Sequence, residues 1–222
     1  MTSLIHLEIK SREALLDSLA TLAGFFWGPD SESCREIRQG SAIRPFKDLE
    51  TLVKFKPPDL LSALDNIISS FAETEALFSH LEEGYVSLFI NSRHGIIAPL
   101  YASCYVEGKA SGEKGLLMGP PAIAMKKRLE SSGLSLADNM NEPPDHLSIE
   151  LEYLYFLLKK GWDDNDSELL TEAVFFAVKA MVPWVTLLRE RIANDNSCRF
   201  YPLITSATVS ILDYIGRQAA SI

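Results

Sequence analysis

The sequence predicts an all-α fold, a single compact bundle of roughly eight to ten helices. Apolar residues recur every three or four positions along most of the chain, whereas alternating strand patterns are scarce. Residues that start and stop helices separate these stretches. The 222 residues, 47% of them hydrophobic, suffice for one well-buried core. We therefore expect residues 1–222 to form one domain.

The first half of the chain begins with the clearest helix. Residues 11–27 place Leu15, Leu19, Leu22 and Phe26 on one face, and Gly28-Pro29 ends the helix. The segments expected next are a short helix over 31–39, a long helix over 57–81, a short apolar helix over 82–90, a loop over 91–99, a short aromatic segment over 101–105 and a surface loop over 107–115.

The second half predicts further helices, separated by a hinge-like stretch. A Pro-Pro pair starts a helix over 120–132, and a hinge follows at 133–144. The next helix starts after Pro143-Pro144-Asp145, and two lysines and Gly161 suit its end. A helix from 168 to 193 should kink at Pro183, and a last one spans 200–219.

Several classes of protein are disfavoured by simple patterns. The first sixteen residues carry acids and lack a long apolar run, so they do not predict a secretory signal. The most apolar window, 173–188, contains Lys179 and Pro183, falls short of a membrane span and is interpreted as a buried helix. Cys34, Cys104 and Cys198 are widely spaced, which fits reduced thiols. We expect a cytoplasmic protein without direct membrane insertion.

The negative charge is concentrated in one window. The chain has a net charge of −9, and residues 130–175 alone account for all of it. A nucleic-acid partner would require the opposite sign, so none is expected. A basic peptide would be attracted to such a surface, although a solvated acidic face kept for solubility explains the charge equally well.

The segment Pro143-Pro144-Asp145-His146 lies in that window. Prolines followed by an aspartate are typical of a helix start, where the aspartate accepts free N–H groups. His146 is not explained by that pattern. It stands four residues before Glu150, and Leu147 and Leu154 flank that glutamate, so a polar strip would edge the apolar face like the lip of a groove. A histidine satisfied near the core is the alternative.

Catalytic chemistry has no positive signal. His146 and Glu150 could bind a metal from one helix face, but a site needs three or four ligands and the four histidines do not cluster. Neither a nucleophile elbow nor a phosphate-binding loop is present. No catalytic residue, metal or cofactor is predicted. A helical metal-dependent hydrolase and an adaptor for a folded partner remain the alternatives to a peptide-binding protein.

The stretch NEPPDHLSIELEYLYFLL, residues 141–158, resembles the Asp-His-Leu segment of the TorD/DmsD family, cytoplasmic chaperones that mature molybdenum-containing redox enzymes. Other similar segments follow in the family's order: REALLDSLATLAGFFWGPD, EGYVSLFI, APLYASCY, LLMGPPAIAMKKRLESSGL, VPWVTLLRERI and FYPLI. Leu100 and Tyr101 stand where the family often has Pro and Trp, and the usual Gly-Pro after Phe89 is missing.

The resemblance implies a TorD-like helical fold, as a monomer or a domain-swapped dimer, without covalent catalysis. It implies binding to the twin-arginine leader and to the body of a molybdoenzyme catalytic subunit, which is held for folding and cofactor insertion before export.

A receptor for such a leader needs carboxylates for guanidinium groups and an apolar groove. Asp145 and Glu142 are expected to contact the arginines, and His146, Leu147 and Glu150 to form the groove edge. The apolar part is expected at Pro99, Leu100, Tyr101 and Tyr105.

Overall fold

The computed structural model describes residues 4–53, 60–91, 95–106, 117–137, 140–195 and 197–218. Within these ranges every regular element is helical, which confirms the predicted all-α class. The α-helices are α1 (Ile9–Trp27), α2 (Ser31–Gln39), α3 (Arg44–Val53), α4 (Leu60–Ser69), α5 (Thr74–Tyr85), α6 (Pro120–Ser131), α7 (Leu147–Asp163), α8 (Ser167–Phe175), α9 (Val182–Ile192) and α10 (Phe200–Gln218).

Short 3₁₀ and π segments complete the fold. The 3₁₀ turn η1 (Leu4–His6) precedes α1, and η3 (Ala102–Tyr105) lies between α5 and α6. The π-helical segment η2 (Val86–Ile90) extends α5, and η4 (Phe176–Met181) joins α8 to α9.

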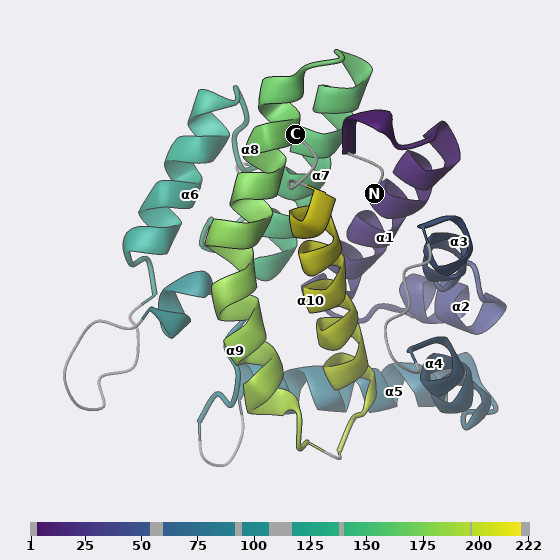
Figure 1. Cartoon of the computed structure of the whole chain (residues 1–222). Helices are drawn as coiled ribbons and strands as arrows, with labels where there is room; N and C mark the ends of the chain where they lie inside the picture. The colour runs from purple at the N-terminus through teal and green to yellow at the C-terminus, as the bar shows by residue number, and fades with distance from the viewer. Residues whose placement is uncertain are drawn as a thin grey trace.

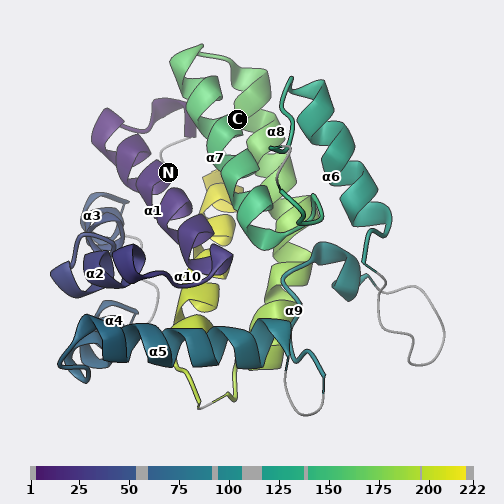
Figure 2. The same ribbon diagram turned by 180° about the vertical axis from the view of Figure 1, so that it is seen from behind.

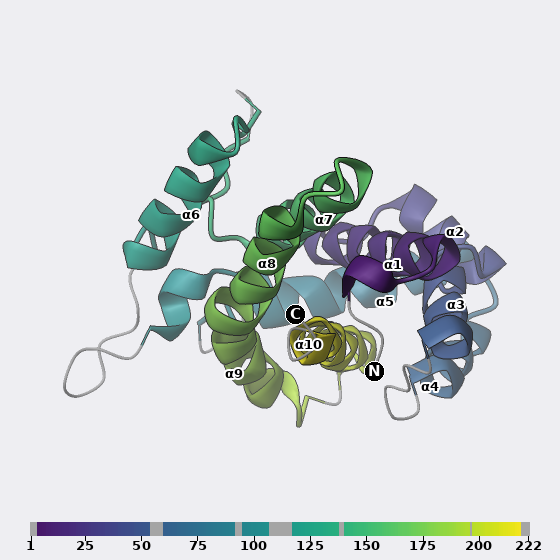
Figure 3. The same cartoon turned by 45° about the horizontal axis from the view of Figure 1, so that its top comes forward.

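Helix α10 lies at the centre of the arrangement, with α9 along one side (Figure 1). Helix α1 packs against α7 and α3, and the view from behind shows α5 crossing below them (Figure 2). Helix α6 stands at the edge of the bundle (Figure 3), and its main contacts are with η3.

The core is joined by an aromatic cluster from three separate parts of the chain. The ring of Phe89 in η2 meets Tyr85 at 5.3 Å and Tyr201 of α10 at 5.1 Å, and Phe26 of α1 at 6.4 Å. The Tyr201 hydroxyl donates to the carbonyl of Leu81 at 3.1 Å. These aromatic sequence segments therefore serve mainly to hold α1, α5 and α10 together.

The predicted helix over 57–81 is wrong as a single element. The chain leaves helix α4 after Ser69 and re-enters a helix at Thr74. The hydroxyls of Ser69 and Ser70 donate to the carbonyls of Asp65 and Ile67 at 2.7 and 2.6 Å, which satisfies acceptors at the end of α4. Residues 57–59 lie outside the described part, as does the predicted loop over 107–115.

The other boundaries differ in informative ways. Residues 82–90 continue α5 instead of forming a separate helix, and α3 was not predicted. The helices expected over 120–132 and 200–219 are α6 and α10. Gly133 has a positive φ of 72°, at the start of the stretch where a hinge is predicted. The single-domain assignment and the hinge stay predictions.

The prediction that α7 ends at Gly161 is wrong. The helix continues to Asp163, and a Cβ atom at position 161 would lie 2.8 Å from the Leu170 side chain. Glycine is therefore required at position 161 because α8 approaches closely there. In the sequence this glycine looks the same as one that caps the end of a helix.

The run from Ser167 to Ile192 is continuous and apolar. By length and composition alone it could cross a membrane. Leu170, Phe176, Met181 and Trp184 nevertheless lie in the protein core. The π-helical η4 ends where Pro183 enters, because a proline cannot donate the hydrogen bond of a regular turn.

Candidate binding site around the start of helix α7

The segment before α7 is held against the segment that leads into η3. The Leu147 N–H donates to the carbonyl of Leu100 at 2.9 Å, and the Ala102 N–H donates to the carbonyl of Asp145 at 3.1 Å. Tyr101 and His146 form the antiparallel bridge between them. The predicted site residues of both segments are thus brought together by main-chain hydrogen bonds.

Asp145 is fully buried and fixes η3. Its Oδ2 atom accepts the Ser103 N–H at 2.7 Å. Its Oδ1 atom has no hydrogen-bond partner among the described residues. The prediction that Asp145 caps helix α7 is wrong, because its carboxylate is turned toward η3.

His146 is the residue that caps α7. Its backbone is extended, with φ −69° and ψ 139°, and its Nδ1 atom accepts the Ser148 N–H at 3.2 Å. The ring stacks on Trp27 of α1 at 4.8 Å and meets the edge of Tyr101 at 5.3 Å. Burial lowers the pKa of His146 to about 4, against the smaller opposing effects of Glu142 and Asp145. The imidazole is therefore neutral at pH 7, as an Nδ1 acceptor requires.

Two carboxylates border this stack. Trp27 donates from Nε1 to Glu152 at 2.8 Å, and the Tyr101 hydroxyl donates to Glu142 at 2.5 Å. Burial and the hydrogen bond to Glu142 raise the pKa of Tyr101, so the phenol stays protonated. We call Trp27, Tyr101, Glu142, His146 and Glu152 the aromatic–acid face. Sequence reasoning missed Trp27 and Glu152, because they are 125 residues apart.

Glu150 points to the opposite side of α7. It is buried, and its Oε2 atom accepts the Trp184 Nε1–H of α9 at 2.9 Å. Burial raises the pKa of Glu150 well above its usual value, which favours the protonated carboxyl group. The expectation that His146 and Glu150 share a face is wrong, because His146 precedes the first helical residue and its backbone is extended.

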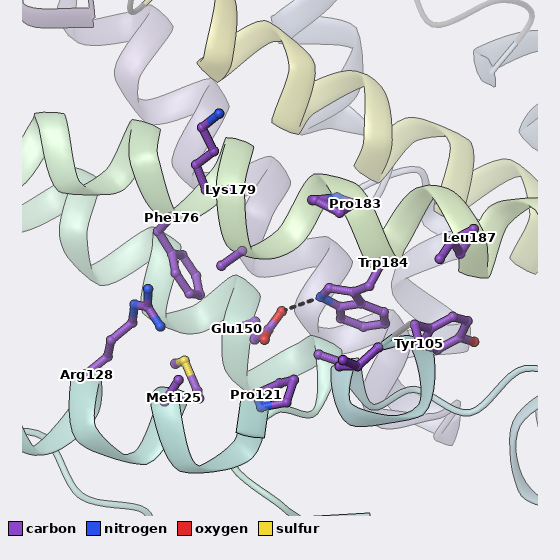
Figure 4. Close-up of a pocket in the computed structure, with 14 residues that line it drawn as sticks. Tyr105, Pro121, Met125, Arg128, Glu150, Phe176, Lys179, Pro183, Trp184 and Leu187 are labelled. Carbon is purple, nitrogen blue, oxygen red and sulfur yellow. Dashed lines mark hydrogen bonds between the residues drawn. The ribbon is translucent and has the colours of Figure 1, made fainter. Parts of the chain in front are cut away.

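Glu150 lines a groove of about 470 Å³ between α6 and the η4–α9 run (Figure 4). We call it the α6–α9 groove. It is lined by Ala102, Tyr105, Val106, Pro121, Ala124, Met125, Arg128, Glu150, Phe176, Lys179, Ala180, Pro183, Trp184 and Leu187. The Tyr105 hydroxyl donates to the carbonyl of Pro99 at 2.9 Å, and the Arg191 guanidinium lies 4.2 Å over the Tyr105 ring.

The expected apolar residues therefore divide into three groups. Tyr101 belongs to the aromatic–acid face, and Tyr105 lines the groove. Leu100 and Leu147 are core residues, 2% and 0% exposed. Pro99 is half-buried and contributes its carbonyl to Tyr105. The single groove expected from the sequence is replaced by two surfaces on either side of η3.

The acidic window is also divided. Asp163 and Asp164 lie at the far end of α7, about 24 Å from its start at 1.5 Å per residue. Lys159 and Lys160 pair with them, at 2.5 and 2.6 Å. These acids do not contribute to the surface around His146.

The described residues contain no group of three His, Cys, Asp or Glu side chains that could hold a metal. The hydrolase alternative relied on His146 and Glu150 acting together, and their side chains have different partners, Trp27 and Trp184. Cys34, Cys104 and Cys198 are all free thiols.

The all-helical fold of this chain is shared with a solved protein structure. A solved structure from Archaeoglobus fulgidus, described as a candidate redox enzyme maturation protein, has the same fold, with a TM-score of 0.52 and 20% identity over 93% of this chain and 94% of that chain.

The chain belongs to the nitrate reductase delta subunit family, whose model matches residues 56–190, and this confirms the predicted relationship to TorD. Chaperone protein TorD of Vibrio cholerae is 30% identical over 54% of each chain. TorD of Psychrobacter is 30% identical over 70% of this chain and 65% of its own. The match with the Vibrio cholerae relative spans about half of that protein's length.

Proposed function

We propose that this protein is a cytoplasmic chaperone that binds the twin-arginine leader of a molybdenum-containing oxidoreductase and holds the catalytic subunit for folding and cofactor insertion before export. The TorD relatives support the chaperone role. The observation that carries leader binding is the aromatic–acid face, where carboxylates of Glu142 and Glu152 border stacked rings.

The chemistry of this face suits guanidinium groups. Arginine binds carboxylates through charge-assisted hydrogen bonds and stacks on aromatic rings. Glu152 is exposed and Glu142 is half-buried, so solvent reaches both residues. Asp145 has no exposed surface, so we assign it the positioning of η3 and not a direct contact with an arginine.

Calorimetry with synthetic twin-arginine leaders tests this function. The leaders encoded beside the gene should bind, and a leader with both arginines replaced by lysines should bind about tenfold more weakly, because lysine cannot stack or form paired hydrogen bonds. Failure of every neighbouring leader to bind would refute the proposal.

Matched variants localise the contact. Glu142→Gln and Glu152→Gln should each weaken leader binding several-fold, whereas Glu168→Gln should not, since Glu168 is exposed near the far end of α7. Added salt should weaken binding to the wild type. Equal effects of all three substitutions would indicate a nonspecific attraction of charge.

A further inference from the structure

The α6–α9 groove differs chemically from the aromatic–acid face. Its lining contains two cations, Arg128 and Lys179, and a single carboxyl, Glu150. That carboxyl is buried against Trp184, and its raised pKa favours the uncharged form. The groove therefore has an apolar floor and a positive edge, in a protein whose net charge is −9.

The size of the groove suits side chains of a peptide. Its volume of about 470 Å³ lies within the range of ligand sites and would accommodate a few large apolar side chains. Val106 and Leu187 are 50% and 36% exposed, although monomeric proteins bury most such groups. Aromatic walls are provided by Tyr105, Phe176 and Trp184.

The two cations lie at the edge of the groove, and Arg128 is paired with Glu172. The Arg128 guanidinium lies 5.4 Å from the centre of the Phe176 ring and 3.7 Å from Glu172, with its side chain 28% exposed. Lys179 is exposed on η4 at the rim of the groove, and its side chain extends away from α6 (Figure 4). A peptide that carries lysines or arginines would meet repulsion here, whereas one that carries carboxylates would be attracted.

We infer that the α6–α9 groove is a second binding site, which takes an amphipathic helical segment of the client's body with large apolar side chains on one face and acidic residues beside them. Such a helix places its apolar side chains at the spacing i, i+3, i+4 into a groove of this kind. The identity of the peptide as a client segment rests on the proposed function, whereas its chemistry rests on the groove alone.

Fluorotryptophan labelling separates the two surfaces in one experiment. The chain has three tryptophans. Trp27 belongs to the aromatic–acid face and Trp184 lines the groove. Trp162, which donates to the carbonyl of Leu4, serves as an internal control. Tryptophan-to-phenylalanine substitutions assign the three fluorine resonances.

The probes are two blocked amphipathic peptides with identical leucines and phenylalanines. One carries glutamates at its polar positions, and the other carries lysines. The glutamate peptide should shift the Trp184 resonance and leave Trp162 unchanged. The lysine peptide should bind about tenfold more weakly at low salt. An unchanged Trp184 resonance, or equal affinity for both peptides, would overturn the inference.

Substitutions on α6 provide the matched control. The double variant Arg128→Gln, Lys179→Gln should lose about tenfold in affinity for the glutamate peptide. The double variant Lys126→Gln, Lys127→Gln removes the same charge from exposed residues of α6 that do not line the groove, and it should bind like the wild type. Equal losses of affinity in both variants would mean that only the net charge of the protein matters, and this would overturn the inference. Melting temperatures measured in parallel report whether each variant is folded.

A groove-filling variant tests the location. Ala124→Phe should place a ring in the groove and abolish the Trp184 shift. If wild type is a dimer that this substitution converts to a monomer, the groove is covered by a second copy and the inference is wrong. A leader that fails to shift Trp27 would refute the proposed function, while the Trp184 result would still decide whether the groove binds acidic peptides.

Discussion

Protonation of His146 should destabilise the folded protein. The imidazole is 3% exposed, and its Nδ1 atom accepts the Ser148 N–H, so a proton cannot be added without breaking the cap of α7. Its pKa falls from the model-peptide value of 6.5 to about 4 on folding. The unfolded chain then binds more protons than the folded chain between these values, so stability is present above pH 6.5 and is lost as the pH falls.

The size of this effect follows from the shift. A shift of about 2.5 pKa units corresponds to about 3 kcal/mol at 1.36 kcal/mol per unit, lost in full below pH 4. Between pH 6.5 and 5 the loss should be about 2 kcal/mol. Glu142 and Asp145 moderate the shift because they favour the protonated ring. Glu150 acts in the opposite direction, since its raised pKa makes the folded state more stable as the pH falls.

Urea unfolding from pH 7.5 to 5, compared with His146→Asn, isolates the contribution. Asparagine retains an acceptor for the Ser148 N–H and does not titrate. It should cost about 1 kcal/mol at pH 7 through lost ring contacts with Trp27 and Tyr101. The gap between the two proteins should then close as the pH falls, and by pH 5 the variant should be the more stable by about 1 kcal/mol. A constant gap would refute the assignment of a neutral, buried His146.

Further predictions concern packing and the two surfaces. Glu150→Gln should remove the loss of stability that the raised pKa of Glu150 causes as the pH rises above the usual carboxyl range, measured by urea unfolding. Gly84→Ala should cost about 2 kcal/mol, because its Cβ would lie 2.4 Å from that of Cys198. Gly24→Ala in α1, where nothing lies within 4 Å, should instead stabilise by about 0.5 kcal/mol or more. A thermal melt that ranks the two glycine variants the other way contradicts this packing. Glu152→Gln should lower leader affinity several-fold with an unchanged melting temperature, since its hydrogen bond to Trp27 is at the surface.

Helix periodicity predicted most of the fold because it depends on local sequence. Residues 11–27, 120–132 and 200–219 were expected to be helical, and α1, α6 and α10 lie there. The failures arose where tertiary contacts or side-chain hydrogen bonds decided. The serines that end α4 donate to its own last turns, and Gly161 is explained only by Leu170 on the next helix.

The candidate site was predictable in its residues and not in its geometry. Spacing along an ideal helix placed His146 beside Glu150, but the extended backbone of His146 turns its ring to α1. The burial of Leu100 and Leu147 could not be predicted from sequence spacing, because it depends on a bridge between residues that are far apart in the chain. Trp27 and Glu152 carried no local signal at all.

The bridge between His146 and Tyr101 explains why these two residue segments occur together. The bridge holds the start of η3, where Tyr101 enters the aromatic–acid face. Tyr105, at the end of η3, lines the α6–α9 groove. Asp145 fixes the turn between them through the Ser103 N–H. A shift of η3 would therefore move a wall of both surfaces at once, since only three residues separate Tyr101 from Tyr105.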